Sequence, residues 1–203
     1  MLRYLALGDS YTIGEGVAPT QRWPAQLVRA LRQDGIELAE PHYIATTGWT
    51  TGELASAIDA AQPLGRWEFV SLGIGVNDQY RGYSRSAYRE GFEHLLATAL
   101  HLTGREDRVL AVSIPDWGVT PFALRQGRDP DVVRREIDDF NDVARRHCEA
   151  HRVAFVDITP ISRDRGGEAD MLTDDGLHPS AAMYARWVDA ILPVAHTLLA
   201  ADA

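Results

Sequence analysis

The feature that most constrains this chain is a regular alternation of short apolar runs with longer segments of helical periodicity. Five runs rich in β-forming residues are expected to be strands, at 3–8, 42–46, 67–73, 108–114 and 153–157. Their apolar residues are nearly continuous, which is typical of strands buried on both faces of a parallel sheet. Helical patterns fill the intervals, at 23–35, 84–103 and 130–150, and in a last helix that begins near Pro179.

This alternation predicts right-handed crossovers and a three-layer α/β/α sandwich around a five-stranded parallel sheet, of the flavodoxin-like kind. Pro193 is expected to kink or shorten the last helix. The segments 115–129 and 158–177 are expected to be long irregular loops, which are often functional in compact domains. Since no repeat or linker interrupts the pattern, we expect residues 1–203 to form a single domain.

Composition narrows the classes of partner. The formal net charge of -9 disfavours binding to phosphate backbones and to anionic membranes, so we expect no nucleic-acid partner and no membrane insertion.

The apolar stretch at the N-terminus is too short for a signal peptide, and a cytoplasmic location is therefore expected. CxxC and HExxH motifs are absent from the sequence, so no metal is expected, and the lone Cys148 fits a small buried hydrophobe. The oligomeric state stays open, with a homo-oligomer among the alternatives.

Polar or glycine-rich turns follow four of the expected strands. They are Gly8-Asp9-Ser10, Thr47-Gly48, Gly75-Val76-Asn77-Asp78 and Pro115-Asp116-Trp117. The carboxyl ends of parallel strands meet at one edge of the sheet, which is where ligands bind in such folds. We therefore expect these turns to converge on one site.

Ser10 is the candidate nucleophile because a turn at the end of a buried strand presents its hydroxyl at that edge. A helix N-cap is the alternative for a serine in this position. Asp175 and His178 lie on one late loop, where the carboxylate can fold back and orient the imidazole as a general base. Asp174 is a rival for the orienting role, and solvated loop acids with a histidine at a helix start are the plainer alternative.

Gly48 and Asn77 are candidates for stabilising an oxyanion. A glycine lets its backbone N–H come close to a ligand, and an asparagine amide can donate a hydrogen bond to developing negative charge. The alternatives are a strand-to-helix turn that merely needs glycine and an ordinary Asx turn.

Together these motifs resemble the SGNH hydrolases, also called GDSL-type esterases and lipases. Ser10 in GDSY, Gly48 in TTGWTTGEL, Asn77 in GVND and the DGLH of Asp175 and His178 match the family's four blocks in order. The resemblance runs from residue 3 to about residue 180. Tyr11 replaces the leucine of the family name, and Thr46-Thr47 stand where many relatives carry a polar amide or arginine. The GxSxG elbow of the α/β-hydrolases is missing, because Thr12 occupies its second glycine position.

The resemblance implies a serine esterase acting on small-molecule carboxylic esters. Ser10 would attack the ester carbonyl, His178 would act as general base oriented by Asp175, and no metal or cofactor would be needed. The oxyanion would be held by the backbone N–H groups of Ser10 and Gly48 and by the Asn77 amide. A short, acetyl-type acyl group is the default, since no long apolar lid segment is present. A lysophospholipase or a thioesterase of the same family is the alternative.

Substrate contacts are expected from residues beside the turns: Asp9, Trp49, Trp117, Tyr80, Tyr83 and Phe122. Aromatic residues near strand ends are also common in cores. A non-catalytic flavodoxin-like ligand-binding module is the rival of a different class. The chain has no lysine, which a receiver domain would need for its ion pair, and Ser10-Tyr11-Thr12 supplies only a partial phosphate loop. A catalytically silent relative is a second rival, against which the intact triad argues.

Overall fold

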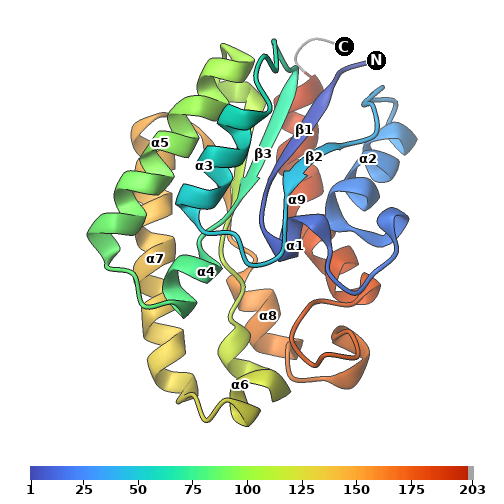
Figure 1. Cartoon of the computed structure of the whole chain (residues 1–203). Coiled ribbons are helices and arrows are strands. Elements are labelled where there is room, and N and C mark those ends of the chain that lie inside the picture. Colours follow the sequence, from blue (N-terminus) through green and yellow to red (C-terminus); the bar gives the residue numbers. More distant parts are fainter. Residues whose placement is uncertain (201–203) are drawn as a thin grey trace.

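A five-stranded parallel sheet forms the centre of the computed structural model, which describes residues 1–200 (Figure 1). Its strands are β1 (Tyr4–Gly8), β2 (His42–Ala45), β3 (Phe69–Gly73), β4 (Val109–Val112) and β5 (Ala154–Val156). They pair in the order β2-β1-β3-β4-β5, the doubly wound order of flavodoxin-like folds. The predicted three-layer α/β/α fold and its five strands are therefore confirmed.

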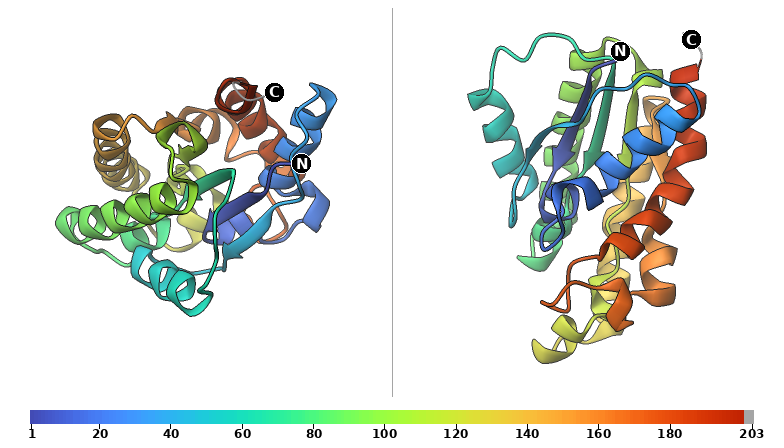
Figure 2. Two further views of the ribbon diagram at one scale, coloured as in Figure 1. Left: turned by 90° about the horizontal axis from the view of Figure 1, so that it is seen from above. Right: turned by 90° about the vertical axis from the view of Figure 1, so that its right-hand side faces the viewer.

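Helices cover both faces of the sheet. One face carries α3 (Thr51–Ala60), α5 (Arg85–Thr103) and α7 (Pro130–Ala150), which contact one another in sequence order. The other face carries α2 (Trp23–Gln33) and α9 (Ala181–Ala200), which pack together (Figures 1 and 2). Every residue of β1 is buried, as expected for a strand between two helical layers. A buried hydrogen bond joins β1 to β3 through side chains, since the Tyr4 hydroxyl lies 2.8 Å from Ser71 Oγ.

Short helices complete the chain. They are α1 (Ser10–Ile13), α4 (Val76–Tyr80), α6 (Pro121–Arg125) and α8 (Thr159–Arg165), with 3-10 turns at Pro19–Gln21, Glu106–Arg108, Trp117–Val119 and Ala169–Met171. The prediction of irregular loops over 115–129 and 158–177 was thus wrong in part, because α6 and α8 lie within them. The Thr120 side chain caps α6 and Pro121 occupies its first position, and Pro160 lies in the first turn of α8.

The last helix continues through Pro193 to Ala200, so the expected shortening does not occur. A proline inside a helix removes one backbone hydrogen bond. Here Ile191, Ala195 and Leu199 are buried on either side of it, and tertiary packing of such a face is the main source of helix stability in proteins. No helix within residues 1–200 is both long and apolar enough to cross a bilayer.

Glycine at position 8 lets the first strand run into the turn that follows it. A Cβ on Gly8 would lie 2.4 Å from the carbonyl oxygen of Gly73 and 2.2 Å from Thr12 Oγ1. Gly8 and Gly73 face each other in the β1–β3 register, but a Cβ on Gly73 would come only as close as 3.2 Å to Thr12 Oγ1. The backbone of β3 therefore leaves no room for a side chain at residue 8.

We expect Gly8→Ala to lower the free energy of unfolding by about 1–3 kcal/mol, the usual cost of overpacking. Gly73→Ala is the matched control on the facing residue, and it should cost clearly less because its Cβ meets only a rotatable hydroxyl. Urea denaturation followed by circular dichroism measures both. Equal stabilities of the two variants would contradict the account of this contact.

Candidate active site

The carboxyl ends of the strands lead into a group of short elements at one end of the molecule, away from both termini (Figure 1). β1 continues into α1, β2 into the loop before α3, and β3 into α4. The late loop that carries Asp175 and His178 reaches the same end, since both Ser10 and His178 line one cavity there. The predicted convergence of the turns at this edge is observed.

Ser10 is the first residue of α1, and the cap of that helix is its neighbour. The Asp9 side chain accepts a hydrogen bond from the Tyr11 N–H at 3.0 Å, while Gly14, at φ 68°, ends the helix. The alternative of Ser10 as an N-cap is therefore ruled out by geometry. Ser10 is 4% exposed, and the surface it retains faces the cavity.

Asp175 holds the ring of His178 through several hydrogen bonds within one short loop. Its Oδ2 lies 2.5 Å from His178 Nδ1, while its Oδ1 accepts from the backbone N–H groups of Leu177 and His178. The Thr173 hydroxyl also donates to Oδ1, at 2.8 Å. Asp174, the rival for this role, and Asp175 are both exposed, so the contact with the ring and not burial separates the two. The carboxylate that meets the imidazole is that of Asp175.

These bonds set the ionisation of Asp175. Partial burial raises the pKa of its carboxyl, but the hydrogen bonds from His178, Leu177 and Thr173 outweigh this and lower the pKa to about 2. The group is therefore an anion at neutral pH. An anion at Nδ1 fixes the ring proton there and leaves Nε2 as the basic nitrogen, which is the tautomer that a general base requires.

Gly48 and Asn77 come from neighbouring loops that are joined by hydrogen bonds. The Asn77 Nδ2 donates to the carbonyl of Trp49 at 2.9 Å, which uses one of its two amide hydrogens. Gly48 adopts φ 88°, and the Trp49 N–H bonds back to the Thr46 carbonyl at 3.3 Å, a pattern of the type II turn, which favours glycine at its third position. The N–H of Gly48 and the second hydrogen of the Asn77 amide take no part in these bonds.

One cavity of about 170 Å³ connects the predicted groups. Its lining is mostly apolar and comprises Ser10, Tyr11, Thr47, Gly48, Val76, Asn77, Tyr80, Trp117, Phe122, Leu177 and His178. The rings of Tyr80, Trp117 and Phe122 contact one another, with centroids 5.4 to 6.4 Å apart. Of the expected lining residues, Trp117, Tyr80 and Phe122 are present. Trp49 and Tyr83 lie outside this lining. Trp49 instead accepts the hydrogen bond from the Asn77 amide through its carbonyl.

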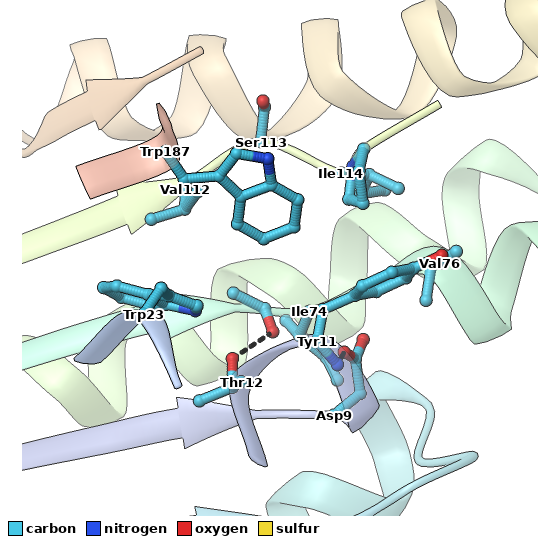
Figure 3. Close-up of a pocket in the computed structure, with 12 residues that line it drawn as sticks. Asp9, Tyr11, Thr12, Trp23, Ile74, Val76, Val112, Ser113, Ile114 and Trp187 are labelled. Carbon is cyan, nitrogen blue, oxygen red and sulfur yellow. Dashed lines mark hydrogen bonds between the residues drawn. The ribbon is translucent and has the colours of Figure 1, made fainter. Parts of the chain in front are cut away.

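Asp9 also lies outside the lining of that cavity, since its side chain is buried and caps the N-terminus of α1. Asp9 lines a second cavity instead, which Tyr11 and Trp187 also line (Figure 3). This space measures about 20 Å³, enough for one water molecule. Burial, together with the nearby charge of Asp78, raises the pKa of the Asp9 carboxyl to about 7, against the lowering effect of the Tyr11 N–H. Asp9 thus supports the turn that carries Ser10 and does not line the cavity that Ser10 and His178 share.

Several supporting residues were not singled out from the sequence. Asp78 is fully buried and accepts from the Thr51 N–H at 3.0 Å and from the Thr51 hydroxyl at 2.6 Å. Arg81 donates to the Gly48 carbonyl at 2.6 Å, and Arg125 donates to the Asp175 carbonyl at 2.5 Å. For Asp78, its place next to Asn77 in the GVND motif was the available signal. The two arginines lie at the C-terminal ends of short helices and resemble any solvated arginine of this chain.

The arrangement brings together a hydroxyl, a basic imidazole with an anionic partner, and free N–H donors in an apolar cavity. This is the set of groups that acyl transfer needs. Comparison with known proteins agrees with this reading: residues 6–186 match the profile of the GDSL-like lipase/acylhydrolase family. The chain belongs to this family. It is accordingly a hydrolase of the esterase/acylhydrolase class, which sets aside the flavodoxin-like binding module.

Other members of this group are similar along the whole chain. Esterase TesA of Pseudomonas aeruginosa is 23% identical over 195 residues, covering 96% of this chain and 88% of its own. The crystal structure of the psychrotrophic esterase EstA from Pseudoalteromonas sp., inhibited by monoethylphosphonate, superposes with a TM-score of 0.76 at 16% identity, over 98% of this chain and 100% of its own. A mutant of Axe2, an acetyl-xylooligosaccharide esterase from Geobacillus Stearmophilus, reaches 0.74 at 19% identity, over 96% and 94%.

The raised pKa of Asp9 predicts a pH-dependent stability. The unfolded carboxyl ionises near pH 4 and the folded one near pH 7, so the folded state binds more protons between these values. The free energy of unfolding should then fall as the pH rises through this window, by up to about 1.4 kcal/mol per pH unit.

Asp9→Asn keeps a capping side chain but cannot ionise. In this variant we expect the fall in the free energy of unfolding that Asp9 causes between pH 4 and 7 to be absent. Urea denaturation at several pH values between 4 and 8 gives the difference between the two proteins. A difference that does not change with pH would show that Asp9 keeps an ordinary pKa in the folded state.

Proposed function

We propose that this protein is a serine esterase in which Ser10, His178 and Asp175 form a catalytic triad. The observation that carries the proposal is the pairing of His178 Nδ1 with Asp175 at 2.5 Å beside a cavity that Ser10 also lines. An anionic Asp175 both orients the ring and stabilises the imidazolium that forms when the ring takes a proton. The inhibition of the structurally similar EstA by a phosphonate is in keeping with an active-site serine in this fold.

The proposed reaction has two halves. Ser10 Oγ attacks the ester carbonyl carbon as His178 Nε2 takes its proton, and the carbonyl oxygen becomes an oxyanion. The N–H groups of Ser10 and Gly48 and the Asn77 amide donate to that oxygen. His178 then passes its proton to the departing alcohol, which leaves an acyl-Ser10 ester. Water attacks this ester with His178 again as base, and the carboxylic acid and free Ser10 are restored.

The acyl group we propose is short. The cavity of about 170 Å³ is smaller than the roughly 300–1,000 Å³ of pockets that enclose drug-sized ligands. Part of its wall is formed by bulky rings, among which Trp117 is 2% exposed and donates a hydrogen bond from its Nε1 to Gln79 Oε1 at 2.8 Å. A rigid aromatic wall favours an acetyl-sized or slightly longer acyl group over a fatty chain. The structurally similar Axe2 is an acetyl-xylooligosaccharide esterase, and an acetyl group lies in the same class.

Ser10→Ala tests the nucleophile. We expect turnover of p-nitrophenyl acetate to fall by about 10³-fold or more, because loss of a triad nucleophile leaves only the binding and oxyanion contributions. Ser113→Ala removes a buried serine near the end of β4 that does not line the cavity, and it serves as the matched control. Wild-type turnover by folded Ser10→Ala would refute the proposed function.

A series of p-nitrophenyl esters of increasing chain length tests the acyl preference. We expect kcat/KM to be highest for acetate to butyrate and to fall beyond about six carbons, as the chain outgrows the cavity. Phe122→Ala should shift the optimum to longer chains. Leu124→Ala, on the same short helix but 68% exposed, should leave it unchanged. A higher kcat/KM for palmitate than for acetate in the wild type would contradict the short-acyl proposal.

A further inference from the structure

We propose that Arg81 is a positioning residue for the oxyanion hole, which it maintains by fixing the turn that carries Gly48. The inference rests on the proposed function, in which the Gly48 N–H and the Asn77 amide donate to one oxyanion. Arg81 itself contacts the carbonyl side of Gly48 and does not line the cavity. Its effect on the reaction is therefore indirect.

The need for such a residue follows from the origin of the two donors. Gly48 lies in the loop after β2, and Asn77 lies in α4 after β3. Donors to one oxygen must keep a fixed separation, since misplacement by about 1 Å can cost about 10²-fold in rate. The two loops must therefore be joined to each other and not only to their own strands.

Gly48 has few means of being held in place. It has no side chain, and a Cβ built on it would meet only the Arg81 guanidinium, at 3.9 Å from Nη2. Its φ of 88° lies in the region that glycine enters freely, so the residue itself supplies little rigidity. Backbone hydrogen bonds are then the main restraint on its position.

Arg81 supplies that restraint directly from the end of α4. Its Nη2 donates to the Gly48 carbonyl at 2.6 Å, and its Nη1 pairs with Glu53 Oε2 at 3.3 Å. Glu53 in turn accepts from the N–H and hydroxyl of Thr50, at 2.8 and 2.9 Å, in the capping box of α3. The guanidinium thus joins the Gly48 turn, the start of α3 and the helix of Asn77.

The other bonds between these loops reach residues that follow Gly48 in the sequence, and the bond to Gly48 itself comes from Arg81. Asn77 bonds the carbonyl of Trp49, and Asp78 bonds the N–H and hydroxyl of Thr51. The alternative is that Arg81 has only a structural role, as the partner of Glu53 in a surface ion pair. Its side chain is 41% exposed, and ion pairs at such exposed positions contribute little to stability. The two roles predict different kinetics.

The test compares Arg81→Met with Arg85→Met in p-nitrophenyl acetate hydrolysis. Arg85 is 64% exposed, pairs with Asp139 and has no contact with the Gly48 turn, so it is the matched control. We expect Arg81→Met to lower kcat about tenfold or more, with KM within about twofold of wild type and an unchanged melting temperature. Arg81→Lys, which keeps a donor for the Gly48 carbonyl, should recover part of the loss, and it serves as the second variant if Arg81→Met folds poorly.

A trifluoromethyl ketone inhibitor provides a readout specific to the oxyanion. Ser10 Oγ adds to its carbonyl carbon while His178 takes the hydroxyl proton, which gives a stable tetrahedral oxyanion. Its inhibition constant should therefore rise in Arg81→Met by the same factor as kcat/KM falls. Unchanged kcat in Arg81→Met would overturn the inference, as would a loss shared by Arg85→Met or an unchanged inhibition constant. A wild type that hydrolyses no ester would instead refute the proposed function itself.

Discussion

The site depends on the parallel pairing of β1 with a neighbour on each side. In that register Gly8 lies opposite Ala45 of β2 and opposite Gly73 of β3. All three strands end at the same level, so the turns that carry Ser10, Gly48 and Asn77 begin side by side. Parallel strands require helical crossovers, and those helices bury both faces of the sheet. The same pairing therefore makes the core and brings distant parts of the sequence to one edge.

Strand pairing alone brings the loops close, and polar contacts then fix them relative to one another. Asp78 is buried and hydrogen-bonded to Thr51, and burial raises its pKa although these bonds and the charge of Arg81 lower it in part. Asp9 is buried in the same way beneath the Ser10 turn. Buried carboxyl groups are costly for a fold, and here they occur in the turns next to Ser10 and Asn77. These two carboxyl groups therefore lower the stability of the fold but hold the turns of Ser10 and Asn77 in a defined geometry.

The sequence predicted the strands and long helices well because their periodicity reflects burial, which the fold then imposes. The helix at Pro130–Ala150 begins and ends where its pattern predicted. The helices α3, α4, α6 and α8 were missed, since short helices depend on caps and tertiary contacts more than on periodicity. The motif residues Ser10, Gly48, Asn77, Asp175 and His178 could be named because each belongs to a recognisable block. The orientation of Asp9 and the bonds of Arg81 and Arg125 could not, because they depend on the distance between loops that are remote in sequence.

The central claim is that Ser10 is an activated nucleophile, and covalent labelling tests it most directly. The protein would be incubated with a fluorophosphonate probe, digested, and analysed by mass spectrometry to locate the modified residue. The account predicts one label per chain, on the peptide that contains Ser10, and no label when His178 is replaced by alanine. Absence of labelling in the wild type, or a label on any other serine, would contradict it.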